Sequence, residues 1–295
     1  MRFCLLTTSV IQILTGVVAF LSQCRIVVNI NTNAFMCYGV CKYFGDNFCF
    51  VANLLQQNLI IAGAIAVIKT FYFRYKMLTI RSMDFRMKLK TSAVFYSFAI
   101  FSLMVHVFND HDTKVVFEET LRLHPDYNYR DFSFFGYSNV KSFMSMVYTI
   151  ITFIYLYGLP VVAYVYRKKI LKILDSLQKK NEKRIANSRG IIQCISLQAC
   201  LPVICFSPSY ALYIVEGFTG KEFLAQEYIV WCIVILPTIL DPIFTISFVR
   251  PYRQLAITHL RQLIQYLKLD IFNCQLRREL HRRRRSVLGN TMVLV

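Results

Sequence analysis

Charged side chains are scarce in this chain, and acidic ones are the scarcest. Only 17% of the 295 residues are charged, and 34 lysine and arginine residues stand against 16 aspartate and glutamate residues, giving a net charge of +18. Hydrophobic residues make up 56% of the sequence. A soluble domain usually has about a quarter of its residues charged. The composition excludes an ordinary soluble domain. It also argues against a nucleic-acid partner, because such a binder would carry its positive charge on a soluble domain.

Sequence motifs of enzymes are also missing. There is no nucleophile elbow, no His-Glu-x-x-His motif and no P-loop. The ten cysteines form neither Cys-x-x-Cys pairs nor Cys/His clusters with the spacing of zinc sites. We therefore predict no enzymatic activity, no catalytic residues, no metal site and no cofactor.

The chain instead has long apolar stretches. A membrane-spanning helix needs about 20 mostly apolar residues, and six stretches come near this length. They cover residues 4–21, 48–68, 92–108, 143–166, 191–215 and 228–249. We therefore predict an all-α membrane protein, with a multi-pass transmembrane helix bundle over residues 1–249 and a tail over residues 250–295.

Positive charge alternates between the segments that connect these stretches. Residues 69–90, residues 167–189 and the tail together hold 26 of the 34 lysine and arginine residues. The positive-inside rule places basic segments in the cytoplasm. Both termini are then cytoplasmic, and residues 109–142 form an ordered outer loop. The alternative is that residues 4–21 are a cleaved signal peptide, which would leave five spans.

The tail carries a helical pattern and a basic run. Apolar residues recur at helical spacing over about 252–268, which predicts an amphipathic helix lying on membrane lipid at the inner surface. Residues 282–285 are four consecutive arginines, interpreted as facing lipid or as a trafficking signal.

Three amide side chains stand close together in the second apolar stretch. Asn53 lies three residues before Gln56 and four before Gln57, so all three lie near one face of a helix. Uncompensated amides are costly in lipid, and this face should turn into the bundle. Two interpretations stay open, namely hydrogen bonds between helices and a polar wall of a ligand pocket.

Asp241 and Pro242 interrupt the last apolar stretch. An ionisable side chain within a membrane span usually marks a functional site. A proline in a helix removes a backbone hydrogen bond and kinks it, and Pro202 does the same in the fifth stretch. Protonation, or a polar partner such as Asn or Gln on a neighbouring helix, would relieve the charge of Asp241. We regard Asp241, Pro242 and Pro202 as candidates for a conformational switch.

Four segments of the sequence resemble a known receptor family. They are "YGVCKYFGDNFCF" (38–50), "FYFRYKML" (71–78), "LQACLPV" (197–203) and "LDPIFTISFVRPYR" (240–253). These segments, in this order, are similar to the nematode chemoreceptors called serpentine receptor class D. The resemblance implies a rhodopsin-like bundle of seven helices. This chain matches it from the second helix onward, so we expect six of the seven helices, with the first absent.

The resemblance also implies a function and partners. It implies a chemosensory receptor in the plasma membrane of sensory neurons, with a small-molecule or peptide ligand and a heterotrimeric G protein as partners. Arg74 and Tyr75 end the second span, where rhodopsin-like receptors have Asp-Arg-Tyr, and are candidates for contacting the G protein. Thr245 stands where such receptors have the Tyr of their Asp-Pro-x-x-Tyr motif. The alternative function is a six-span channel or transporter with both termini in the cytoplasm.

The cysteines before the second span allow a local cross-link. Cys41 and Cys49 are eight residues apart and both lie on the predicted outer side, where a disulfide could form. Residues 109–142 contain no cysteine, so the bridge typical of rhodopsin-like receptors cannot form there. We expect His106, His111 and Asp112, near the outer membrane face, to be solvated.

Overall fold

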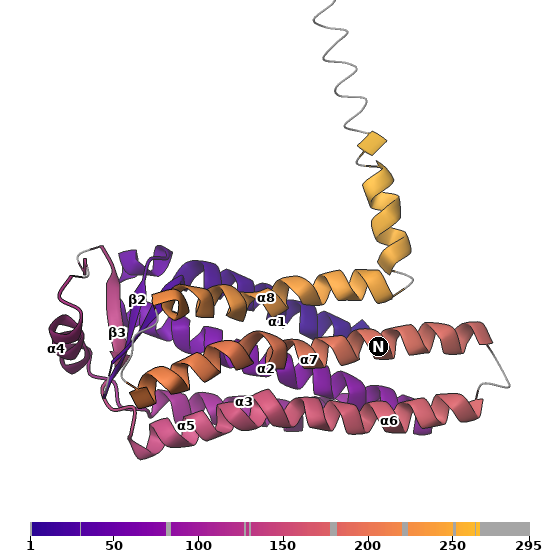
Figure 1. Cartoon of the computed structure of the whole chain (residues 1–295). Helices are drawn as coiled ribbons and strands as arrows, with labels where there is room; N and C mark the ends of the chain where they lie inside the picture. Colours follow the sequence, from indigo (N-terminus) through magenta and orange to yellow (C-terminus); the bar gives the residue numbers. More distant parts are fainter. Residues whose placement is uncertain are drawn as a thin grey trace, which may run out of the picture. The chain divides into compact units, whose positions relative to one another are not determined.

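The computed structural model describes residues 2–29, 31–80, 84–126, 128–129, 131–177, 182–219, 224–249, 252–262 and 264–265. Within this part of the chain, long helices run side by side and a small sheet covers one end of them (Figure 1). The chain divides into two compact units, Met1–Thr245 and Ile246–Val295, and each is described by itself.

Each of the six predicted spans falls on a long helical segment. These segments are α1 (Arg2–Ser22), α2 (Asp46–Thr79), α3 (Phe85–Val107), the continuous run α5 (Phe143–Phe153), η2 (Ile154–Gly158) and α6 (Leu159–Leu177), α7 (Glu182–Thr219) and α8 (Leu224–Phe248). The prediction of a helical membrane protein is confirmed. Helices α7 and α8 stay helical through four prolines, including Pro202 and Pro242.

Four described segments are long and apolar enough to cross a membrane by length and composition. They are Asp46–Thr79, Phe85–Val107, Phe143–Ser176 and Ser188–Leu212. Leu6–Ser22 and Ile235–Phe248 are shorter apolar helices. The count of six spans, and the boundaries given for them, stay predictions.

A cap of short elements covers one end of the bundle. It consists of β1 (Cys24–Val28), β2 (Asn33–Cys37), η1 (Val40–Phe44), α4 (Thr113–Leu123) and β3 (Ser133–Tyr137). The strands form an antiparallel sheet in the order β1-β2-β3, with Ile26 opposite Phe35 and Phe35 opposite Phe135. A Cβ at Gly136 would lie 2.1 Å from the Asn33 carbonyl oxygen and 2.7 Å from the Val116 side chain. Only glycine therefore lets β3 pack this closely between β2 and α4.

Successive helices alternately end and begin at the cap. Helix α1 ends two residues before β1, α2 begins just after η1, and α3 and α5 flank the segment that holds α4 and β3. Helices α2 and α6 therefore end at the opposite end of the bundle, where α3 and α7 begin. These connections therefore lie alternately at the two ends of the bundle, and the assignment of one end to the cytoplasm stays a prediction.

Two kinds of contact hold the bundle together. Away from the cap, a core of apolar side chains from α2, α6 and α7 includes the fully buried Phe71 and Ile170. Nearby, the fully buried Lys69 donates to Thr7 Oγ1 (3.0 Å) on α1 and to the Tyr96 hydroxyl (2.9 Å) on α3. Lys69 was predicted to belong to a basic inner connection, whereas its side chain lies inside the bundle.

The second unit contains a helix over residues 252–262, and its described side chains are exposed or half-exposed. The rest of the predicted amphipathic helix lies largely outside the described residues, as does the basic run 282–285.

Candidate functional site

A cavity of about 280 Å³ lies directly beneath the cap sheet. Its walls come from all three strands, from α2, from α5 and η2, and from α7. Side chains that line it include Ile26, Phe35, Gln57, Tyr137, Tyr148, Thr152, Tyr155, Pro202 and Phe206. The cavity is therefore bounded by the cap on one side and by helices of the bundle on others.

The lining combines apolar surface with a few hydroxyl and amide groups. Among the described lining residues there is no Asp, Glu, Lys, Arg or His. A concave, mostly apolar site with a few convergent polar groups is the usual form of a small-molecule site. One wall contains the π-helical turn η2, which carries Tyr155 and Leu156, and such turns occur often at functional sites.

Of the three amides predicted to line a pocket, the structure brings Gln57 to the cavity. Its Oε1 accepts a hydrogen bond from the Tyr148 hydroxyl, 2.8 Å away. Gln56 is buried and accepts a hydrogen bond of 2.6 Å from Ser22 Oγ at the end of α1. Asn53 is fully buried, and within the described residues neither of its side-chain polar atoms has a hydrogen-bond partner. Successive residues of a helix point about 100° apart, so Gln56 and Gln57 serve different interfaces.

His106 lies behind the cavity wall and was not predicted as part of it. Its ring is fully buried and stacks on Tyr148, with the ring centroids 4.1 Å apart. Its Nε2 shares a hydrogen bond with the Tyr137 hydroxyl, and its Nδ1 lies 3.5 Å from Asn58 Nδ2. Burial raises the pKa of Tyr137 well above its ordinary value, so this hydroxyl keeps its proton. The expectation that His106 is solvated was wrong, because Tyr137 arrives from β3, which the sequence analysis did not predict.

The two other polar residues of this region serve the cap. His111 stacks on Phe50 with ring centroids 4.8 Å apart. Asp112 caps α4, since its Oδ1 accepts hydrogen bonds from the backbone of Lys114 and Val115.

A buried ion pair ties the cap to α8. The Arg25 guanidinium of β1 contacts the Glu227 carboxylate in the first turn of α8, and both side chains are at most 10% exposed. Neighbouring residues of a strand point to opposite faces. Arg25 therefore reaches α8 while Ile26, next to it, lines the cavity.

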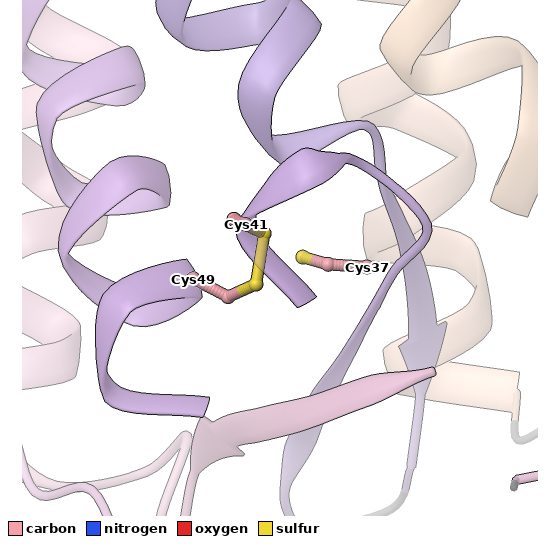
Figure 2. Close-up of side chains that lie close together, drawn as sticks. All are labelled: Cys37, Cys41 and Cys49. Atoms are coloured by element: carbon pink, nitrogen blue, oxygen red, sulfur yellow. A yellow bond between two sulfur atoms is a disulfide. The ribbon is translucent and has the colours of Figure 1, made fainter. Parts of the chain in front are cut away.

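Two disulfides cross-link the cap, and one of them fixes it to the start of α2. One joins Cys41 to Cys49, the pair that the spacing suggested, and the other joins Cys24 to Cys37 across β1 and β2. Figure 2 shows the Cys37 side chain pointing toward the Cys41–Cys49 bond, and the three sulfur atoms lie within 4.8 Å of one another. Three sulfurs this close could hold a soft metal ion only as thiolates, and here all of them are in disulfides.

Asp241 belongs to a polar cluster between three helices. Its Oδ2 accepts a hydrogen bond of 2.6 Å from Gln12 Nε2 of α1. On α7, Gln198 Nε2 donates to the Asp241 carbonyl oxygen (3.3 Å) and to Thr245 Oγ1 (3.1 Å). Of the two ways in which the charge of Asp241 could be relieved, protonation or a polar partner, the structure supplies a polar partner, Gln12. Of the other switch candidates, Pro202 lines the cavity and Pro242 follows Asp241 in α8.

Arg74 and Tyr75 lie in the last two turns of α2, at the end of the bundle away from the cap. Tyr75 packs on Tyr166 of α6 with ring centroids 5.9 Å apart, and Lys169 Nζ lies 6.0 Å from its ring centre. Arg74 is half-buried, and among the described residues its Nε has no hydrogen-bond partner.

Comparison with known proteins gives consistent matches over most of the chain. The model of the family described as serpentine type 7TM GPCR chemoreceptor Srd matches residues 1–258. Serpentine receptor class delta-50 of Caenorhabditis elegans is 37% identical over 231 residues, which cover 78% of this chain and 68% of the relative. Serpentine receptor class delta-51 of the same organism is 30% identical over 257 residues, which cover 86% of this chain and 75% of the relative.

Proposed function

Because the chain belongs to the serpentine Srd family of seven-transmembrane chemoreceptors, we propose that it binds an external chemical in the cavity beneath the cap. The resemblance predicted from the sequence is confirmed, and so is the class of function, a chemosensory membrane protein of the G-protein-coupled type. The observation that supports this site is the position of the cavity between the cap sheet and α2, α5 and α7.

A route from the cavity to the opposite end of the bundle runs along α7. Pro202 lines the cavity, and Gln198 stands one helical turn before it and binds the Asp241 carbonyl and Thr245 of α8. A ligand shifts the conformational equilibrium only if it binds one helix packing more tightly than another. A ligand pressing on Pro202 would change how α7 packs against Asp241 and Pro242, which makes these three residues the proposed switch.

The partner at the other end is a heterotrimeric G protein, contacted by Arg74, Tyr75 and the basic ends of the helices there. The receptor acts in the plasma membrane of sensory neurons, with membrane lipid around its bundle. Family membership does not favour the alternative of a six-span channel or transporter.

Basal nucleotide exchange on a purified G protein tests the proposed coupling. The receptor is reconstituted in lipid nanodiscs, and Arg74→Ala should lower the exchange rate about tenfold, equivalent to about 1.4 kcal/mol of contact energy. Lys114→Ala removes the same charge from the exposed start of α4 in the cap and should change nothing. Equal exchange by Arg74→Ala and the unmodified receptor, at equal thermal stability, would count against coupling there. Ion current through the reconstituted receptor without any G protein would favour the channel instead.

A further inference from the structure

The part of the cavity lining that the structure describes offers no countercharge for an ionic ligand. The described lining residues are all neutral, and Arg25, which precedes the lining residue Ile26 in β1, is paired with Glu227 of α8. Moving an isolated charge out of water into such a site is far more costly than moving a neutral polar group. The neutral lining therefore points to an uncharged ligand. This inference rests on the proposed function, since it concerns the ligand of the same cavity.

The hydroxyl groups of the lining have mostly donated their hydrogens to the protein. Tyr148 donates to Gln57 Oε1, and Tyr155 donates to the Phe98 carbonyl oxygen at 2.9 Å. Thr149 and Thr152 donate to backbone carbonyls one helical turn earlier, each at 2.9 Å. A hydroxyl that has donated its hydrogen keeps oxygen lone pairs that accept one. These four residues therefore present hydrogen-bond acceptors to the cavity.

A ligand that only accepts hydrogen bonds could pair with an amide such as Gln57 Nε2 but would leave these four hydroxyl oxygens without a partner. A site built to pair with a ligand hydroxyl or N–H rejects an analogue that lacks it, because its own polar groups stay unpaired. The volume of about 280 Å³ is at the small end of ligand sites, and most of the lining is apolar. The size leaves no room for a folded peptide segment.

We propose that the cavity selects a small uncharged molecule with an apolar body and one hydrogen-bond donor, of the alcohol class, which donates to the hydroxyl oxygens of Tyr148, Thr149 and Thr152. Organic acids, amines and peptides are excluded as ligands of this site. Because the ligand must donate a hydrogen bond, the cavity should prefer an alcohol to an ether of the same carbon skeleton.

Binding to matched probes tests this proposal without any G protein. The full chain in nanodiscs is titrated at neutral pH with four probes that share a cyclohexyl ring, namely cyclohexylmethanol, its methyl ether, the cyclohexylmethylammonium ion and the cyclohexanecarboxylate ion. A ligand that binds only the folded state raises the unfolding temperature according to its concentration relative to Kd. We expect the alcohol to bind at least about tenfold more tightly than each of the other three probes. We expect the same difference in Kd between n-hexanol and its methyl ether, ammonium and carboxylate analogues.

Two variants separate binding in the cavity from partition into lipid. Thr152→Trp should abolish stabilisation by the alcohol because the indole fills the cavity. Thr152→Val keeps the shape and removes one acceptor, so the preference for alcohol over ether should fall several-fold while the protein stays folded.

Each contrary outcome identifies which part is wrong. A carboxylate or ammonium probe that binds as tightly as the alcohol overturns the neutral-ligand inference, and an ether that equals the alcohol overturns selection by a donor. If neither alcohol stabilises the receptor at millimolar concentration, the proposal that the cavity binds an alcohol is overturned. If alcohols bind as predicted but no probe changes nucleotide exchange, the ligand class stands and the proposed signalling function fails.

Discussion

At the scale of single residues, His106 is the side chain that holds two aromatic residues of the cavity wall in place. Replacing it by Phe keeps a ring to stack on Tyr148 and removes the hydrogen bond to Tyr137. An orphaned buried hydroxyl costs roughly 1–3 kcal/mol. We predict that His106→Phe lowers the free energy of unfolding by that amount and weakens alcohol binding, measured by thermal unfolding with and without the probe. Unchanged stability and unchanged binding would show that His106 positions nothing.

Asp241 depends on Gln12, which gives a second prediction at this scale. Gln12→Leu should lower cell-surface expression, because it removes the hydrogen bond to a carboxyl group inside the bundle, worth roughly 1.5–3 kcal/mol. The loss should be smaller in the Asp241→Asn background, where no charge can form. Substitution of the neighbouring, exposed Ile13 by Leu is the control. Equal losses in both backgrounds would mean that the two side chains act independently.

For single residues, the sequence predicted what kind of partner a side chain needs better than which neighbour it meets in the fold. The cost of a carboxylate in hydrocarbon predicted that Asp241 needs either protonation or a polar partner, and the structure supplies Gln12 as a partner. Asn53, Gln56 and Gln57 were grouped by helical spacing, yet spacing alone does not tell which neighbour each one meets. The role of His106 required knowing that β3 brings Tyr137 across the sequence, and no local pattern carries that information.

At the scale of elements, the pair Arg25–Glu227 fastens strand β1 to helix α8. Removing one member of a buried pair leaves an uncompensated charge and costs roughly 3–5 kcal/mol. We predict that Arg25→Met destabilises the receptor by this amount, and that the double variant Arg25→Met with Glu227→Met recovers most of it, as judged by thermal unfolding in nanodiscs.

An exposed ion pair elsewhere in the chain is the matched control. Arg189 and Asp175 are 42% and 62% exposed, and such pairs contribute less than about 1 kcal/mol. Arg189→Met should therefore have little effect. If Arg25→Met were as mild as Arg189→Met, the cap would be held to the bundle mainly by its disulfides and apolar contacts.

The long helices of this fold follow from long apolar runs, and each predicted span falls on one of them, whereas the short helix α4 was not predicted. The strands could not be predicted in the same way. Each has only five residues, their sequences mix Arg, Asn and Ser with apolar residues, and they pair partly across more than 90 positions of sequence, as Phe35 does with Phe135. The Cys24–Cys37 disulfide was missed for the same reason, because it depends on the β1–β2 pairing.

At the scale of the whole molecule, this receptor has a cavity that is covered by a cap containing disulfides. Composition and charge alternation were enough to predict a multi-pass membrane protein, and four short segments were enough to identify the family. The cavity could not be predicted, because its walls come from strands and helices that meet only in the folded chain.

Filling the cavity tests the central claim most directly. Thr152 lines the cavity, whereas Ile150, two residues earlier on α5, is 59% exposed. With both variants at normal surface expression, we predict that Thr152→Trp abolishes the G-protein response to an activating chemical and that Ile150→Trp leaves it intact. A full response from Thr152→Trp, at unchanged potency, would contradict the assignment of this cavity as the ligand site.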